Sequence, residues 1–196
     1  MNTTVKGPDG QPRCRWCSAA PEFIAYHDKE WGYPVDDDTR LFEKLCLEGQ
    51  QAGLSWITVL KKRPNYRARF HGFDPALVAA MTDEDIEECL LDAGLIRHRG
   101  KLEAIRKNAR AWVAAEKEGL NWSEWLWSFV GGSPIINRYA QLKECPAQTD
   151  ESKAMSKALK KIGFGFVGPT TCYAFMQSMG MVNDHLTNCP CHPDNL

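Results

Sequence analysis

Cysteine and histidine residues gather near both ends of this chain, and they constrain its fold more than any other feature. Cys14 and His27 lie near the start of the 196 residues, and His185 and Cys189 lie near the end. Two sulfur and two nitrogen ligands suit a structural zinc ion in tetrahedral coordination. An ion held by residues of both groups would fix the two ends of the chain beside each other.

Further residues of the same types leave the ligand set open. Cys17, Cys191 and His192 compete for the same ion, and unligated surface residues are the simpler alternative. Nucleobase deaminases hold a catalytic zinc through a His-x-Glu and Pro-Cys-x-x-Cys pattern. That pattern is missing from this sequence, which disfavours a catalytic metal and favours a structural one.

The polar start of the chain indicates a reducing compartment. The segment from Met1 to Arg15 does not have the pattern of a signal peptide, so we expect a cytoplasmic protein without a disulfide framework. Residues 1–12 are expected to be a loose tail, and 13–196 a single domain. The other cysteines are interpreted as small buried hydrophobic residues: Cys46, Cys89, Cys145 and Cys172.

The composition is that of an ordinary soluble globular protein, with 43% apolar and 25% charged residues. No apolar run reaches the roughly 18 residues of a membrane helix, so we expect no membrane partner. We also expect a monomer. The net charge of −1 argues weakly against nucleic-acid binding. A neutral protein can nevertheless carry a basic patch on one face, so composition leaves this function open.

Helix start and stop signals recur along the chain, whereas the alternation of a strand is nearly absent. We therefore expect an all-α fold of about eight helices. The expected helices begin at Asp37 or Asp38, Ser55, Asp74, Thr82 and Ser123, or cover residues 101–118, 152–162 and 169–180. The helix that begins at Thr82 is expected to stop at Gly94.

A glycine-rich turn between two helices is the most telling local motif. A helix that carries lysines ends at Gly163, and Pro169 begins the next helix. Backbone N–H groups at a helix start bind phosphate, and glycines let a DNA backbone approach closely. The alternative is an ordinary helical corner. The candidate DNA-backbone residues are Gly163, Gly165, Gly168, Lys160 and Lys161.

One carboxylate falls on an apolar helix stripe. Glu48 follows Leu41 by seven residues and Leu45 by three, so it faces the same side. A carboxylate among aromatic rings is a receptor for a flat cationic ligand. The alternative is a solvated glutamate beside core aromatic residues. The candidate pocket aromatics are Trp16, Tyr26, Trp31 and Trp56.

Taken together, these segments resemble the bacterial DNA-3-methyladenine glycosylase I family of the helix-hairpin-helix glycosylases. The matching stretches are Arg13-Cys14 with Trp16, Ala25 to Asp28, Glu30 to Gly32, Leu47 to Trp56, Ile96 to Lys101, Gly163 to Gly168, and Val182 to His185 with Cys189. They run through nearly the whole chain from Arg13 onward, and residues 1–12 have no counterpart in the family.

The resemblance implies roles for the residues above. It implies a zinc site at Cys14, His27, His185 and Cys189, and it leaves Cys17 and His192 as spectators. It places Glu48, as the catalytic candidate, with the four aromatic residues around a flipped base, and it makes residues 163–168 the hairpin that grips DNA. Many superfamily relatives use an aspartate near the position of Asp184, but this family is thought not to, so Asp184 receives no catalytic role.

The resemblance also implies a reaction. We expect hydrolysis of the N-glycosidic bond of 3-methyladenine in alkylated double-stranded DNA, which leaves an abasic site. Relatives that nick the strand place a lysine two residues after the last hairpin glycine, where this chain has Thr170, so we expect no lyase activity. The alternatives are a non-catalytic, zinc-stapled DNA-binding module and a zinc hydrolase for small molecules. A zinc ion with four protein ligands disfavours the hydrolase.

Overall fold

Nine α-helices occur in the described part of the chain, residues 4–17 and 20–196 of this computed structural model. They are α1 (Pro21–Lys29), α2 (Asp38–Gln50), α3 (Trp56–Arg69), α4 (Pro75–Ala80), α5 (Asp83–Leu91), α6 (Arg99–Lys117), α7 (Trp122–Ser128), α8 (Asp150–Ile162) and α9 (Pro169–Ser178). The expectation of a mainly helical fold is confirmed. None of these helices is long and apolar enough to span a bilayer.

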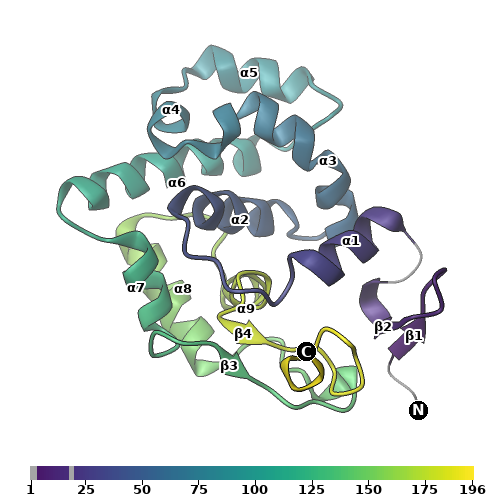
Figure 1. Cartoon of the computed structure of the whole chain (residues 1–196). Coiled ribbons are helices and arrows are strands. Elements are labelled where there is room, and N and C mark those ends of the chain that lie inside the picture. Colours follow the sequence, from purple (N-terminus) through teal and green to yellow (C-terminus); the bar gives the residue numbers. More distant parts are fainter. Residues whose placement is uncertain (1–3, 18–19) are drawn as a thin grey trace.

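Helix α2 lies in the middle of the molecule, with α3 to α6 on one side and α7 to α9 on the other (Figure 1). It packs against α3, α6, α7 and α9, and every residue from Leu41 to Gln50 is buried. Asp37 caps its start, because its carboxylate accepts the N–H of Arg40 at 2.8 Å. This position explains why the charged residues Glu43, Lys44 and Glu48 lie away from water.

The apolar core extends from α2 into α6 and α7. Phe42 meets Trp112 edge to face with ring centroids 5.3 Å apart, and Trp112 stacks on Trp122 at 4.1 Å. Trp122 donates its Nε1–H to the carbonyl oxygen of Trp112 at 3.1 Å. These rings hold the long helix α6 against the centre of the molecule.

Two small sheets lie outside the helical expectation. β1 (Thr4–Lys6) pairs antiparallel with β2 (Pro12–Cys14), and β3 (Ile135–Ile136) pairs parallel with β4 (Val182–Asn183). Each strand has only two or three residues. Such a short strand is too brief to show the alternation by which a strand is recognised in a sequence.

The N-terminal segment differs from the loose tail that we expected for residues 1–12. From Thr4 onward it forms the β1–β2 hairpin, and residues 1–3 lie outside the described part. Arg13 explains why the hairpin is ordered, because its guanidinium pairs with Asp9 and with Asp28, each at 2.7 Å. The turn is closed by Gly10 with φ 77°. Asn188 also donates to the Thr4 hydroxyl at 3.2 Å, which ties the hairpin to the other end of the chain.

Several helix boundaries also differ from expectation. Helix α1 has no clear start signal beyond Pro21 and was not among the expected helices. Helix α7 begins at Trp122, one residue before the expected Ser123, because Asn121 is its N-cap. Helix α5 ends at Leu91 rather than at Gly94, since the Asp92 carboxylate accepts the Gly94 N–H at 2.7 Å and turns the chain.

Candidate functional site

The two ends of the chain meet at four buried ligand atoms. The side chains of Cys14, His27, His185 and Cys189 place one ligand atom each within 4.8 Å of the others. Cys189 Sγ lies 3.6 Å from His27 Nε2 and 3.7 Å from His185 Nδ1, and Cys14 Sγ lies 3.8 Å from His185 Nδ1. Sulfur and nitrogen ligands of one tetrahedral zinc ion are separated by about 3.5 Å, so the four side chains fit such an ion.

The outer nitrogen of each histidine is held by a partner. His27 Nδ1 lies 2.7 Å from the Asp28 carboxylate, and His185 Nε2 lies 2.9 Å from the carbonyl oxygen of Trp31. Both partners accept a hydrogen bond, so the remaining nitrogen of each ring carries a lone pair toward the cluster. This orientation is the one that a metal ligand requires.

The residues that competed for the ion in the sequence occupy other places. His192 Nε2 lies 3.0 Å from the Asn137 carbonyl oxygen. Cys191 Sγ lies 4.0 Å from His27 Nδ1, the nitrogen that faces Asp28. Cys191 thus forms a second group of close ligand atoms with His27 and Asp28. Among the described residues, Cys17 is buried and lies outside both groups. The geometry thus distinguishes the four clustered ligands from the other cysteine and histidine candidates, which the sequence alone did not.

Beside this cluster lies a cavity of about 220 Å³ that brings all the predicted pocket residues together. Trp16 comes from the 3-10 turn Arg15–Cys17, Tyr26 from α1, and Glu48 from α2. Trp31 follows α1, and Trp56 begins α3. The complete lining is Trp16, Tyr26, Trp31, Glu48, Gln51, Trp56, Leu142, Cys145, Ala174, Gln177 and Asp184.

The aromatic residues form one connected wall. Trp16 and Trp31 meet edge to face at 4.8 Å between ring centroids, and Tyr26 lies 5.4 Å from Trp56. The Trp56 indole N–H is buried and has no hydrogen-bond partner among the described residues. An unpaired buried donor is costly, and this one belongs to a residue that lines the cavity.

Glu48 is buried, with 5% of its side chain exposed, and it is not alone. The Lys44 ammonium lies 3.2 Å from Glu48 Oε1 and is also 5% exposed. Lys44 further donates to the Tyr26 hydroxyl at 2.6 Å and lies 3.4 Å from the centroid of the Trp56 ring. Sequence reasoning missed Lys44, although its position four residues before Glu48 on one helix predicts an ion pair.

Burial changes the titration of both members of this pair. Loss of water raises the pKa of Glu48, and the nearby ammonium opposes that rise. Loss of water lowers the pKa of Lys44 to about 8, although Glu48 acts in the opposite direction. As an ion pair, the two side chains together carry no net charge.

Asp184 also lines the cavity, but its carboxylate is occupied. Tyr173 and Gln177 donate to Oδ2 at 2.6 and 2.8 Å, and Asn137 donates to Oδ1 at 2.7 Å. A carboxylate held by three donors is a fixed structural acceptor. Gln177 and Gln51, which sequence reasoning also missed, add amide groups to the polar side of the cavity.

The glycine-rich turn lies between α8 and α9, where the sequence predicted it. Gly163 ends α8 with φ 114°, a left-handed conformation that favours glycine. The other positive φ falls on Phe166, at 56°, and Gly168 has φ −65° as the N-cap of α9. Of the three glycines, therefore, only Gly163 is required by its φ.

The turn is anchored to neighbouring helices. Asn108 on α6 accepts the Gly165 N–H at 2.8 Å and donates to the Gly165 carbonyl oxygen at 3.2 Å. A Cβ added to Gly49 on α2 would lie 3.0 Å from the Cβ of Phe166, so the turn rests directly on α2. Lys160 and Lys161 are exposed and make no ion pair among the described residues.

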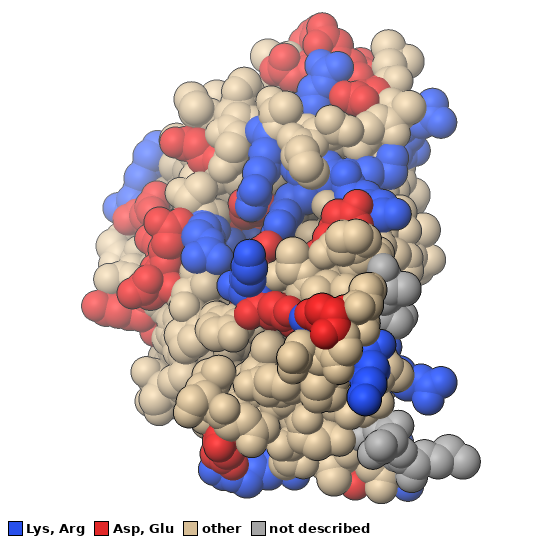
Figure 2. All heavy atoms as spheres, turned by 45° about the vertical axis from the view of Figure 1, so that its right-hand side comes forward, with Lys and Arg blue, Asp and Glu red and all other residues tan. Residues whose placement is uncertain are grey.

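A hollow of about 520 Å³ lies beside this turn and adds cationic side chains to it. Gly165 and Phe166 form one edge, and Arg106, Lys107 and Arg110 of α6 line the other. The spread of charge over the molecule is uneven as well. Figure 2 shows Lys and Arg side chains gathered in a band across one face, although the net charge is −1.

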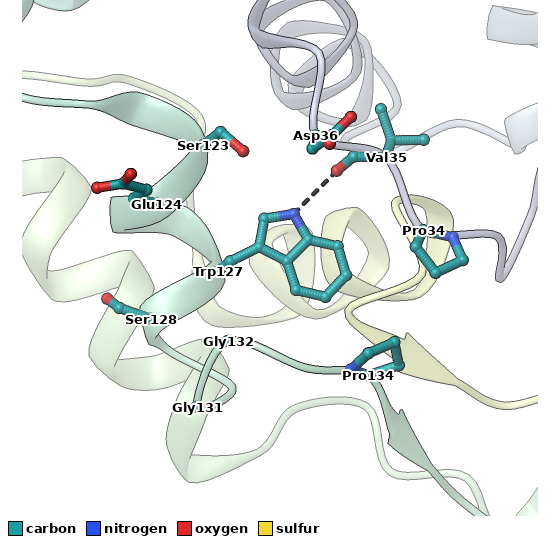
Figure 3. A pocket seen from close by; sticks show the side chains of 10 residues that line it. All are labelled: Pro34, Val35, Asp36, Ser123, Glu124, Trp127, Ser128, Gly131, Gly132 and Pro134. Carbon is teal, nitrogen blue, oxygen red and sulfur yellow. Dashed lines mark hydrogen bonds between the residues drawn. The ribbon is translucent and has the colours of Figure 1, made fainter.

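Another hollow, of about 730 Å³, lies elsewhere and contains none of the predicted site residues. Its floor is Trp127, which donates to the Val35 carbonyl oxygen at 2.9 Å (Figure 3). The ionisable residues in its lining are Asp36 and Glu124. Two carboxylates repel phosphate, so this hollow does not suit a nucleic-acid backbone.

Comparison with known proteins shows which family the chain resembles. A family model described as methyladenine glycosylase matches residues 16–192. The DNA-3-methyladenine glycosylase of Haemophilus influenzae is 62% identical over 179 residues, which cover 91% of this chain and 97% of that protein. A crystal structure of 3-methyladenine DNA glycosylase I has a TM-score of 0.91 and 60% identity, and the match covers 92% of this chain and all of the other.

A further structure, of a variant of 3-methyladenine DNA glycosylase I in complex with 3-methyladenine, has a TM-score of 0.89 at 38% identity. That match covers 92% of this chain and 97% of the other.

Proposed function

The chain belongs to the methyladenine glycosylase family, and from this premise we propose that it removes 3-methyladenine from DNA by hydrolysing the N-glycosidic bond. The supporting observation is the single cavity that Glu48 shares with Trp16, Tyr26, Trp31 and Trp56. A volume of about 220 Å³ is below the roughly 300–1,000 Å³ of drug-sized pockets and suits one base. The product is an abasic site.

The substrate chemistry explains why so few groups are needed. Alkylation at N3 gives the adenine a positive charge, and the base leaves as a neutral molecule once the glycosidic bond breaks. Strong general acid catalysis is therefore unnecessary. The protein has to hold the nucleotide outside the helix, at a cost of a few kcal/mol, and exclude normal bases. Water then adds to the sugar.

We propose that Glu48 accepts a hydrogen bond from the exocyclic amino group of the base. Lys44 lies against Oε1, and the second oxygen, Oε2, is the acceptor for the base. The aromatic wall stacks on the flat ring, and the unpaired Trp56 N–H is a further donor for it. A charge-assisted hydrogen bond contributes about 1.5–3 kcal/mol, which is enough for selectivity.

The hairpin is proposed as the grip on the DNA backbone. Support comes from the start of α9 at Gly168-Pro169, where N–H groups point out of the helix. Lys160 and Lys161 add charge without competing ion pairs. This contact binds double-stranded DNA without reading its sequence. The reaction ends at hydrolysis, because Thr170 stands where strand-nicking relatives place a lysine.

The four ligands Cys14, His27, His185 and Cys189 are proposed to hold one zinc ion. Their spacing and buried positions support this assignment. Since all four positions would be filled by protein, the ion would cross-link the two ends of the chain and activate no water. Residues 13–196 would then act as one catalytic domain.

One assay tests the proposed function directly. Duplex DNA treated with a methylating agent is incubated with the protein, and the released bases are separated by chromatography. The expected product is 3-methyladenine together with abasic sites in intact strands. Binding of the duplex without any base release would instead indicate a DNA-binding module.

A further inference from the structure

Lys44 is the most completely enclosed cation beside the pocket. Its ammonium contacts Glu48 Oε1 at 3.2 Å and the Tyr26 hydroxyl at 2.6 Å. It also lies over two aromatic rings, 3.4 Å from the centroid of Trp56 and 4.5 Å from that of Tyr26. Both rings line the cavity, whereas Lys44 itself lies behind them. A lysine side chain is seldom buried without a partner. Here the partners of Lys44 are themselves residues of the pocket, so Lys44 can affect how the pocket binds a ligand.

In the described part of the chain, Lys44 is the cation that pairs with Glu48. Arg63 of α3 pairs with Glu30 through two hydrogen bonds of 2.7 and 2.8 Å. The other ionisable groups around the pair come from α1 and its end, from α3, and from the far side of the cavity: Tyr26, Glu30, Arg63, Cys145 and Asp184.

We propose that Lys44 is a positioning residue of the base pocket, which keeps Glu48 ionised and holds its Oε1 so that Oε2 faces the base. This inference rests on the role proposed above for Glu48. A protonated carboxyl has one O–H donor and a neutral acceptor, and a neutral acceptor binds the amino group of the base more weakly than a carboxylate does. The lysine therefore maintains the acceptor that base recognition needs.

The ion pair between Lys44 and Glu48 also determines how the pocket attracts a cationic base. Lys44 and Glu48 together carry no net charge, and Lys44 already lies against one face of Trp56. The attraction for a cationic base therefore depends on one oriented carboxylate oxygen rather than on a negative pocket. Burial raises the pKa of Glu48 even with Lys44 present. Without Lys44 that pKa would rise further, because the opposing charge would be lost.

The pH dependence of excision by Lys44→Met tests this role. Methionine keeps the length of the side chain and removes the charge. We expect single-turnover release of 3-methyladenine from methylated duplex to stay within about threefold of the parent at pH 8.5. At lower pH the rate should fall by about tenfold per pH unit, with its midpoint at least about one unit above that of the parent. A decrease by one constant factor at every pH, with the midpoint unmoved, would show that Lys44 only holds the carboxylate in place and would overturn its role in keeping Glu48 ionised.

Two further variants identify the partner of Lys44. Glu48→Gln should lose the acid limb of the profile, and the Lys44→Met, Glu48→Gln double variant should match Glu48→Gln alone. A double variant that is slower than Glu48→Gln by the whole Lys44→Met factor would show that Lys44 acts elsewhere. Normal excision by Glu48→Gln would refute the proposed role of Glu48 itself, which is a separate outcome.

Lys101 offers a matched control. It is also a buried lysine, and its ammonium donates to the carbonyl oxygen of Gln50 at 2.9 Å rather than to Glu48. Lys101→Met should lower stability without moving the midpoint of the pH profile. If Lys44→Met does not fold, infrared difference spectra between the parent and Glu48→Gln at pH 7.5 give the answer. A carboxylate band from Glu48 is expected, and a protonated carboxyl band would overturn the proposal.

Discussion

The Trp31 side chain separates the base cavity from His185. Its ring meets that of His185 edge to face at 4.7 Å between centroids, and its carbonyl oxygen lies 2.9 Å from His185 Nε2. The same indole lines the cavity that contains Glu48. The candidate metal site therefore supports one wall of the candidate base pocket, and the two should respond together when either is altered.

The first prediction concerns the metal. We expect one zinc ion per chain in the purified protein, measured by elemental analysis. Cys14→Ala removes a ligand of the cluster and should lower the free energy of unfolding by about 4 kcal/mol or more, because metal binding contributes to folding. Cys17→Ala is the matched control, since Cys17 is equally buried but lies outside the cluster, and it should cost only about 1 kcal/mol. Equal melting temperatures for the two variants would contradict the ligand assignment.

Removal of the metal should also loosen the pocket wall. A strong chelator is expected to lower affinity for free 3-methyladenine, because Trp31 would lose the fixed His185 ring against which it packs. Tryptophan fluorescence titration with the base measures this effect. An unchanged dissociation constant in a protein shown to be free of metal would mean that the base pocket does not depend on the metal site.

The second prediction concerns Glu48. Glu48→Gln keeps the size of the side chain and loses its charge, so affinity for free 3-methyladenine should fall by about tenfold to hundredfold, the effect of one charge-assisted hydrogen bond. Metal content and helical circular dichroism should be retained. If the variant binds and excises the base as well as the parent does, Glu48 is a structural carboxylate only.

The third prediction distinguishes the role of the hairpin in DNA binding from its role in folding. A Cβ on Gly168 meets nothing within 4 Å, and the backbone there has φ −65°, so Gly168→Val should fold. It should weaken binding of duplex DNA by about tenfold, because the side chain would stand where a phosphate approaches. Gly163→Val is the contrasting variant, since φ 114° strains any side chain and lowers stability instead. Unaltered DNA affinity in folded Gly168→Val would refute the role of the hairpin.

The fourth prediction is that the protein forms no covalent bond to DNA. Borohydride traps the Schiff base that a lysine nucleophile makes with the sugar. Because Thr170 occupies the corresponding position, treatment during turnover should leave the protein and the damaged strand separate on a denaturing gel. A trapped complex would show that another amine performs lyase chemistry.

The fifth prediction concerns acid stability. Burial raises the pKa of Glu30, but hydrogen bonds from Arg63 lower it below the ordinary 4.5. A lowered carboxyl pKa contributes stability above the unfolded value, and this contribution is lost as the pH falls through the folded value. Arg63→Met should thus lower the melting temperature by about 2–4 °C at pH 7. The difference from the parent should shrink below about pH 4.

Arg138 provides the control for that measurement. Its pair with Asp194 is largely exposed, with 62% and 49% of the two side chains accessible. Exposed pairs contribute little, so Arg138→Met should leave the melting temperature nearly unchanged at both pH values. A pH-independent loss in Arg63→Met would show that Arg63 stabilises by packing alone.

The mainly helical fold could be predicted because its signals are local. Asp37, Asp74 and Thr82 cap their helices as their sequence positions indicate. The N-terminal hairpin could not be predicted from the same signals. Its order depends on Arg13 reaching Asp28, and that contact exists only after α1 has packed.

The candidate site shows the same division. An acid on an apolar stripe made Glu48 a pocket candidate, and the family resemblance placed the aromatic residues around it; all of them line one cavity. Lys44 was missed because its pattern is that of a common surface ion pair on a helix. Only the burial of all of Leu41–Gln50 turns it into a cation inside the protein.

The contact between Phe166 and Gly49 fixes the distance between the hairpin and Glu48. Gly49 follows Glu48 directly, and any side chain there would push against Phe166. Helix α2 thus carries the contact with the hairpin on Gly49 and the proposed base acceptor on the residue before it, Glu48. A duplex held by its phosphates at the hairpin would present each nucleotide at a constant offset from Glu48. Only a nucleotide that rotates out of the duplex by that offset would reach the carboxylate, whatever the sequence around it.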